Sequence, residues 1–304
     1  MLLLKYLQTA GYNNIRYTEK FVIAEGEIPV CLIAHMDTVF IRPPFEFFYD
    51  SQKKVLWAPY GSGFDDRAGI YAIIQCLEAG LRPHIIFTDE EEKGGIGARD
   101  VIHVFPDCPF NDCRCLIQLD RANEIDSVFY DCDNQDFEKY INKFGFKTNW
   151  GTFSDISTIA PAWEIAAVNL SIGYVDEHTS NERLYCKWCD KTIEKVKRIL
   201  IAAKNMKSYA YIPIKYNAKY WDKVYGYGYG AWWNDYPRED DFEEEEEEDR
   251  YSRCLMCGGS ITEKTRKIIP DKVYPYAVCN KCFAEYYDEN SVYKGGFTDQ
   301  GNAV

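Results

Sequence analysis

Histidine and acidic side chains follow several apolar runs of this sequence, at the points where buried strands would end. The pairs are VCLIA (30–34) before His35, HIIFT (84–88) before Asp89 to Glu92, CLIQL (115–119) before Asp120, and AAVNLSI (166–172) six residues before His178. Ligands of open α/β sheets bind beyond the carboxyl ends of the strands. Imidazole and carboxylate groups are common ligands of zinc and related metals. The pattern therefore predicts a metal centre at one edge of a β-sheet.

Two further acidic positions fit this interpretation. Asp65 lies in GSGFDDRAG, just before an amphipathic helix, and Asp37 lies two residues after His35. Residues two apart in a strand share a face, so Asp37 could brace the His35 ring. Each residue also has an ordinary explanation, because Asp65 and Asp66 could cap the helix and an aspartate after a strand is often a turn former. The joint occurrence of two histidines and several carboxylates favours the metal site.

These residues resemble the co-catalytic dizinc exopeptidases, which include bacterial aminopeptidases, the tripeptidase and related carboxypeptidases and deacylases. The matching motifs, in the family's order, are HMDTV (35–39), GFDDRAG (63–69), EEKGGIGA (91–98), Asp120 and GYVDEHTSNE (173–182). The resemblance covers about two thirds of the chain. It implies an α/β fold with a mostly parallel central sheet flanked by helices, and two catalytic zinc ions.

The resemblance also implies a role for each metal-site residue. Asp65 would bridge the two metals, His35 and Asp120 would complete one zinc site, and Glu92 and His178 would complete the other. Three protein ligands per ion leave a coordination position open, as in catalytic zinc sites. Asp37 would hydrogen-bond to His35 and fix its tautomer.

The string TDEEEK (88–93) leaves the position of the family's Glu pair to be decided. In the family the pair is followed by x-G-x-x-G-A, and the glycines of this chain fit only if the pair is Glu91 and Glu92. Glu91 is then the expected general base, which takes a proton from a water activated by the metals and returns it to the leaving amine. Asp89 and Glu90 are expected to be solvated or supporting carboxylates.

The sequence says less about the substrate. Asp120 and His178 are 58 residues apart, and His35 and Asp65 are 30 apart, so neither interval has room for the lid or extra β-domain of larger relatives. Candidate substrate contacts are Asp155, Arg67 and Arg121. An acidic pocket residue would favour a free α-amine and an arginine would favour a carboxylate. We favour an aminopeptidase acting on small peptides, with a deacylase or carboxypeptidase as the first alternative.

The elements that position these residues occupy residues 1–207. The four apolar runs are predicted strands, and DRAGIYAIIQCLEAG (66–80) is a predicted helix with Ile70, Ile73, Ile74 and Leu77 on one face. A last helix is expected from about Asn181 to Met206, with Leu184, Trp188, Val196 and Leu200 forming its buried stripe. Cys186 and Cys189 on this helix, and Cys108, Cys113 and Cys115, are interpreted as packed thiols.

A Tyr/Gly-rich and acidic linker, partly disordered, is predicted for residues 208–252. Ten acidic residues between 239 and 249 account for most of the formal charge of −13, and the rest of the chain carries only −3. Bulk charge therefore does not exclude a nucleic acid, although the acidic run makes one an unfavoured partner. The chain has no signal peptide or membrane-length apolar stretch, so we expect a cytoplasmic protein. The oligomeric state is left open.

A second domain is predicted for residues 253–304. Cys254 and Cys257 form one C-x-x-C pair and Cys279 and Cys282 form another, a pattern typical of a structural zinc ribbon with one ion. Such a module could dock a protein partner. A catalytically inactive adaptor, binding through the ribbon or the acidic linker, is the second alternative function.

Overall fold

The computed structural model describes residues 2–214, 262, 264, 266–269 and 276–286. The chain divides into two compact units, Met1–Ile214 and Lys215–Val304. None of the described helices is long and apolar enough to cross a membrane.

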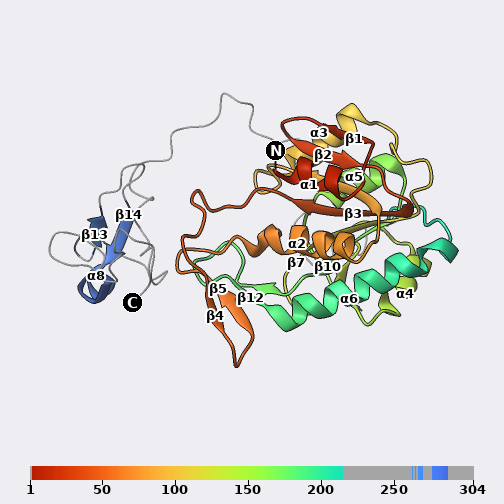
Figure 1. The fold of residues 1–304 in the computed structure, drawn as a ribbon. Coiled ribbons are helices and arrows are strands. Elements are labelled where there is room, and N and C mark those ends of the chain that lie inside the picture. The colour runs from red at the N-terminus through yellow and green to blue at the C-terminus, as the bar shows by residue number, and fades with distance from the viewer. Residues whose placement is uncertain (1, 215–261, 263, 265, 270–275, 287–304) are drawn as a thin grey trace, which may run out of the picture. The chain divides into compact units, whose positions relative to one another are not determined.

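The first unit is built on an eight-stranded sheet with the order β1-β2-β6-β3-β7-β10-β8-β9. Strands β1, β2, β3, β7 and β10 are labelled in Figure 1. Its four central strands are parallel, and they are β6 (Pro83–Thr88), β3 (Ile28–His35), β7 (Leu116–Arg121) and β10 (Ala167–Ser171). These are the four strands expected from the apolar runs. All residues of β6 and β10 are buried, which explains why these strands read as continuous apolar runs rather than alternating ones.

Shorter strands extend the sheet at both edges. They are β1 (Ile15–Tyr17), β2 (Phe21–Ala24), β8 (Asp126–Val128) and β9 (Lys147–Thr148). β2 is antiparallel to β6, and β8 is antiparallel to β10, so the parallel core is bordered by antiparallel strands.

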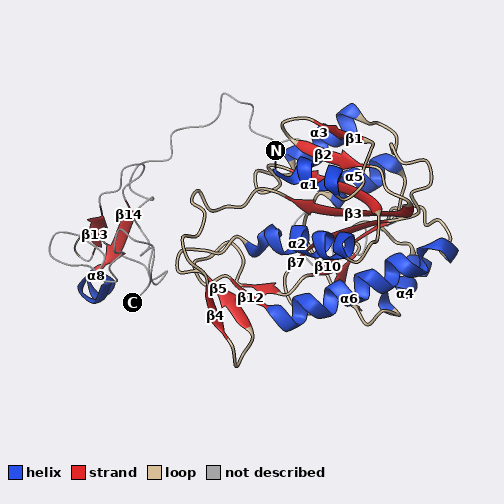
Figure 2. Cartoon of the chain, in the orientation of Figure 1, coloured by secondary structure: helices blue, strands red, loops and turns tan. Residues whose placement is uncertain are grey.

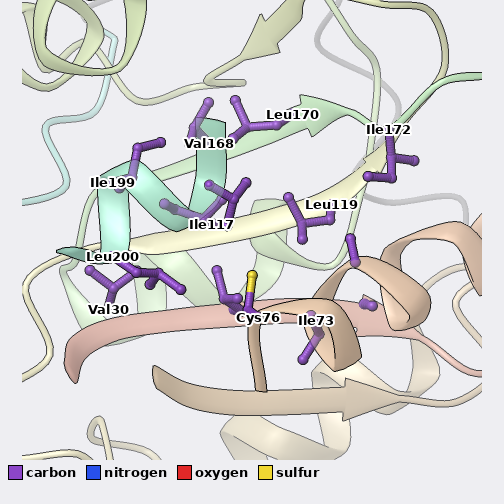
Figure 3. Close-up of a cluster of buried hydrophobic side chains, with 14 of the residues drawn as sticks. Val30, Ile73, Cys76, Ile117, Leu119, Val168, Leu170, Ile172, Ile199 and Leu200 are labelled. Atoms are coloured by element: carbon purple, nitrogen blue, oxygen red, sulfur yellow. The ribbon is translucent and has the colours of Figure 1, made fainter. Parts of the chain in front are cut away.

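Helices cover both faces of the sheet. One face packs against α1 (Leu2–Thr9), α2 (Phe64–Glu78), α4 (Gln135–Asn142) and α6 (Cys186–Ala202), and the other against α3 (Ile96–Val104) and α5 (Ile156–Trp163) (Figure 1). Figure 3 shows part of the larger cluster, with Ile73 and Cys76 of α2, Ile199 and Leu200 of α6, and strand residues such as Ile117, Val168 and Leu170. Each fully buried aliphatic side chain of this kind stabilises the fold by about 1.5 to 3 kcal/mol.

The buried residues of α2 differ in part from those predicted. Ile73 and Leu77 are buried, but Ile70 and Ile74 are only half-buried. The helix instead presents small residues to the sheet, and a Cβ added at Gly69 would lie 2.3 Å from the backbone oxygen of Leu119. A close helix-to-strand approach therefore replaces the larger side chains.

The predicted final helix begins later than expected. Residues Arg183–Tyr185 form strand β12, α6 starts at Cys186, and a short 3-10 helix (Ala203–Asn205) follows it. Leu184 is buried, but in β12 opposite Leu56 and not on the helix. The helical spacing of Leu184 was coincidental, because pairing with β5 fixes this segment as a strand.

β12 belongs to a second, four-stranded antiparallel sheet of order β11-β12-β5-β4. Its other members are β11 (Tyr174–Val175), β5 (Val55–Trp57) and β4 (Phe48–Asp50). Strands β4, β5 and β12 are labelled in Figure 2. This sheet joins the segment before α2 to the segment before α6.

Residues 208–214, part of the predicted linker, pack on the first unit. The Tyr209 ring is buried and lies 5.0 Å from Phe137 and 5.6 Å from Tyr140, centroid to centroid. Ala210 forms a β-bridge with Ile165. The compact unit therefore continues to Ile214.

The second unit is described only in part. Strands β13 (Arg266–Ile269) and β14 (Tyr276–Cys279) pair antiparallel, and α8 (Asn280–Tyr286) follows directly. Cys279 ends β14 and Cys282 lies in α8, while Cys254 and Cys257 lie outside the described residues. The zinc ribbon remains a prediction.

Candidate metal centre

His35 ends β3 at the carboxyl edge of the sheet, with only 1% of its surface exposed. Its Nε2 atom lies 2.9 Å from Asp65 Oδ1 and 3.3 Å from Asp120 Oδ1. Its Nδ1 atom lies 3.1 Å from the backbone oxygen of Asp37 and 3.2 Å from Asp37 Oδ1. One ring nitrogen thus faces two carboxylates while the other is held by Asp37, an arrangement that fixes the ring for coordination through Nε2.

His178 faces the same centre from the loop after β11. Its Nε2 atom lies 3.1 Å from Asp65 Oδ2 and 2.9 Å from Glu92 Oε2. The His178 side chain is half-exposed, whereas Glu92 and Asp65 are nearly buried. The two oxygens of Asp65 therefore face two different histidines.

The structure brings the five predicted ligands together in one place. The ligand atoms of His35, Asp65 and Glu92 all lie within 4.8 Å of one another, and so do those of His35, Asp66 and Asp120. Asp120 is the last residue but one of β7, and its backbone N–H donates to the Asn169 side chain on β10 at 2.9 Å. Strands β3 and β7 pair in parallel, which is why His35 and Asp120 end at the same edge.

The charge balance of this centre fits a cation. Burial and the charge of Asp65 raise the pKa of Asp120 to about 7, and burial and Asp120 raise the pKa of Glu91 to about 9. Burial also acts to raise the pKa of Asp65, but His178 and His35 outweigh it and the pKa is lowered. Glu92 Oε1 is buried and has no hydrogen-bond partner in the described part of the chain. An orphaned carboxylate oxygen beside crowded carboxylates is the donor set that a metal ion would satisfy.

Asp37 connects the histidine to the acidic turn after β6. Its Oδ1 accepts a hydrogen bond from the backbone N–H of Glu91 at 3.0 Å, and its Oδ2 accepts one from that of Glu92 at 3.2 Å. The turn continues through Gly94 and Gly95, both at positive φ. Asp37 thereby fixes Glu91 and Glu92 relative to His35.

Asp66, near the start of α2, accepts hydrogen bonds from two backbone N–H groups. Its Oδ1 accepts from the backbone N–H of Gly69 at 2.9 Å, and its Oδ2 accepts from that of His35 at 3.2 Å. The side chain is fully buried. Asp66 therefore joins the start of α2 to the end of β3.

Glu182 was not identified from the sequence, although it closes the last motif. It is 1% exposed, its Oε1 accepts from Asp65 N–H at 2.9 Å, and its Oε2 accepts from Ser62 N–H at 3.0 Å and Gly63 N–H at 2.5 Å. The sequence offers one signal for it, a glutamate four residues after the predicted ligand His178. It holds the loop that carries Asp65.

The three candidate substrate contacts occupy different surroundings. Asp155 is fully buried, its Oδ2 accepts from the Thr88 hydroxyl, and burial raises its pKa to about 6. Arg67 donates to the backbone oxygen of Ser62 at 3.0 Å, and Arg121 donates to that of Trp150 at 3.3 Å. In this structure Asp155 is enclosed within the protein, and both guanidinium groups contact backbone oxygens.

The cysteines of residues 2–214 are not among the candidate metal ligands. Cys115 and Cys189 are buried, while Cys108, Cys113 and Cys186 are half-buried. No cysteine belongs to the candidate metal-binding groups of the described residues. The eight cysteines of residues 2–214 are free thiols, in keeping with packed side chains.

Comparison with solved structures identifies the fold. The chain is similar to aminopeptidase PepT from Bacillus cereus and to a tripeptidase from Staphylococcus aureus, each with a TM-score of 0.55 and 14% identity. Each match covers 67% of this chain and 92% of the other. No protein-family description and no curated protein matches the sequence. The α/β unit therefore has the fold seen in these two peptidases.

Proposed function

We propose that this chain is a metal-dependent hydrolase of peptide bonds, and more specifically a dizinc aminopeptidase. The observation that carries the proposal is the Asp65 carboxylate, with Oδ1 2.9 Å from the Nε2 of His35 and Oδ2 3.1 Å from the Nε2 of His178. A carboxylate between two imidazoles, each with a further carboxylate beside it, is the ligand set of a two-metal site. The fold of the two solved peptidases supports the same assignment.

The residues divide between two ion positions. His35 and Asp120 would hold one ion, Glu92 and His178 would hold the other, and Asp65 would be shared. When bound, two zinc ions supply Lewis-acid polarisation of the scissile carbonyl and lower the pKa of a water toward ~7.

Glu91 is the proposed general base. It follows the β6 edge beside Glu92, and its backbone is fixed by Asp37. Burial and the neighbouring carboxylates raise the pKa of its side chain, and bound cations would favour the carboxylate form that accepts a proton. It would take the proton of the attacking water and deliver it to the leaving amine.

We further propose that the enzyme recognises the free amino end of its peptide substrate. The centre is lined by carboxylates, which would attract the free α-amine of a peptide. A deacylase or carboxypeptidase would use the same metals on a different amide. Rates on a free dipeptide and on its N-acetylated form separate the two: we expect cleavage of the free form, and cleavage of the acetylated form alone would favour the alternative.

We also propose that Cys254, Cys257, Cys279 and Cys282 hold one structural zinc. The two C-x-x-C pairs support this, and the β13–β14 hairpin followed by α8 supplies a small scaffold for the second pair. Such a ribbon could bind a protein partner. An inactive adaptor is less well supported, because every proposed ligand and Glu91 are present around the centre.

A further inference from the structure

A pocket of about 440 Å³ opens beside the metal centre, between the loop after β3 and the turn after β6. Its lining residues are Asp37, Thr38, Val39, Ile41, Asp89, Glu90, Glu92 and Lys93. Glu92 belongs both to this pocket and to the proposed metal site. A group bound in the pocket would therefore lie next to the reacting bond of a substrate.

The charges of the pocket are unequal. Four of its lining residues are acidic and one, Lys93, is basic. The Glu90 carboxylate is neutralised on both sides, by Lys20 and by Lys93 at 3.0 Å. Asp37 is engaged with His35 and with the backbone of the acidic turn.

Asp89 is the carboxylate of the pocket that lacks such a counterpart. Its backbone is fixed, since its N–H donates to the Lys20 oxygen at 2.8 Å and its oxygen accepts from Gly97 N–H at 3.0 Å. Its carboxylate forms no hydrogen bond or ion pair with any residue that the structure describes. A second oxygen without a partner is Glu92 Oε1, on a side chain that is 8% exposed.

The other wall of the pocket is aliphatic. Val39 and Ile41 are 40% and 85% exposed, and this apolar surface is costly to leave in water. The carboxylates alone do not converge as a cation site, because neither group of candidate ligands in the described chain includes Asp89 or Glu90. An aliphatic wall and an unpaired carboxylate together suit a long alkyl stem that ends in a positive charge.

We propose that this pocket binds the side chain of a lysine or arginine residue in the peptide substrate, with Asp89 as its counter-ion. Val39 and Ile41 contact the methylene stem, and Asp89 receives the ammonium or guanidinium group. This inference rests on the proposed peptidase function, since it specifies which peptides that site prefers.

The test compares lysyl, norleucyl and glutamyl anilides with the zinc-loaded full chain. Norleucine has the stem of lysine without the charge, so the ratio of the two kcat/KM values isolates the ion pair. We expect lysine to be preferred by about tenfold, the usual scale of a charge-assisted hydrogen bond. The preference should shrink as salt is raised, because the pocket is open to solvent.

Two substitutions at Asp89 test whether its carboxylate causes the preference for lysine. Asp89→Asn should remove most of the preference for lysine over norleucine, and Asp89→Lys should shift it toward the glutamyl substrate. Asp107→Asn is the matched control, because Asp107 is exposed beyond the far end of α3 and should leave the ratio unchanged. Equal rates on lysine and norleucine in the wild type, or an unchanged ratio in Asp89→Asn, would overturn the inference.

The outcome separates this inference from the function on which it rests. Hydrolysis without a preference for lysine refutes the pocket and leaves the peptidase in place. If none of the anilides is hydrolysed, the affinities of the same chain for lysinamide and norleucinamide, measured by calorimetry, still test the pocket. Tighter binding of lysinamide, lost in Asp89→Asn, supports the pocket, and equal or absent binding refutes it.

Discussion

The backbone N–H of Asp65 donates a 2.9 Å hydrogen bond to the buried carboxylate of Glu182. Ser62 and Gly63 donate to the other oxygen, so one side chain accepts three backbone N–H groups of the same loop. Glu182 follows His178 by four residues. The segment that supplies one proposed ligand therefore also positions the loop of the shared ligand.

Glu182→Gln should weaken zinc binding by about 10- to 100-fold, the usual cost of removing a partner that orients a ligand. The amide offers one acceptor oxygen in place of two, so part of the loop loses its partner. We also expect the metal-free chain to lose about 1 to 3 kcal/mol of stability. Chelator competition measures the first effect and denaturant unfolding the second.

Glu194→Gln is the matched control for that experiment, because Glu194 is an exposed residue of α6 that pairs with Lys197. It should change neither quantity. If Glu182→Gln binds zinc as tightly as the wild type, Glu182 has no positioning role.

Glu91→Gln should lower kcat by a factor of about 10² to 10⁴ with little change in zinc content, because the amide cannot accept the proton. Turnover of a free dipeptide and metal analysis of the same sample give both values. Glu19→Gln, at an exposed position, serves as the control. Full activity in Glu91→Gln would remove this residue from the mechanism.

His84 should make the fold sensitive to mild acid. It is buried near the amino end of β6, whereas the candidate metal centre lies at the carboxyl ends of the strands. Its Nδ1 accepts from Gly26 N–H at 3.1 Å, and its Nε2 lies 2.9 Å from Asp112 Oδ1. Burial lowers its pKa below 6.5 although Asp112 acts to raise it. As the pH falls, the imidazole is therefore protonated in the unfolded chain before it is protonated in the folded chain. The contribution of neutral His84 to the free energy of unfolding is complete above pH 6.5 and decreases as the pH falls below this value.

The measurement is the free energy of unfolding at pH 7.5 and pH 5.5. His84→Asn keeps an acceptor for Gly26 and should show a smaller loss than the wild type over this interval. Other titrating groups are common to both proteins and cancel in the difference. Equal losses in the two proteins would show that His84 does not contribute.

Zinc content tests the two kinds of metal site together. We expect about three ions in the full chain, two at the catalytic centre and one in the ribbon. Cys254→Ser combined with Cys257→Ser should remove one ion and leave peptidase activity. A single ion in the full chain, lost in this variant, would favour the adaptor alternative.

The sequence predicted the central strands and the gathering of His35 and Asp120 because these depend on local patterns, whereas the place of Asp65 beside them was implied by the family resemblance. A continuous apolar run forms a buried strand wherever helices cover both faces, and parallel strands bring their carboxyl ends to one edge. The wrong start of the last helix has the opposite cause. Leu184 fits a helical spacing, but it pairs with Leu56 from a distant segment.

Long-range contacts also explain what was missed. Glu182 has its role only because the loop of Ser62 and Gly63 lies against it, and its spacing from His178 does not predict that contact. The Asp89 carboxylate is without an ion-pair partner in the described residues because Lys20 and Lys93 both pair with Glu90. Such features follow from the packing of segments and become visible only in three dimensions.

The central claim is that Asp65 is shared by two metal ions, and anomalous diffraction tests it most directly. Crystals of the zinc-loaded chain would be measured on both sides of the zinc absorption edge. We predict two anomalous peaks about 3.5 to 4 Å apart, one between Asp65, His35 and Asp120 and the other between Asp65, Glu92 and His178. A single peak, or none, at the Asp65 carboxylate would contradict the account.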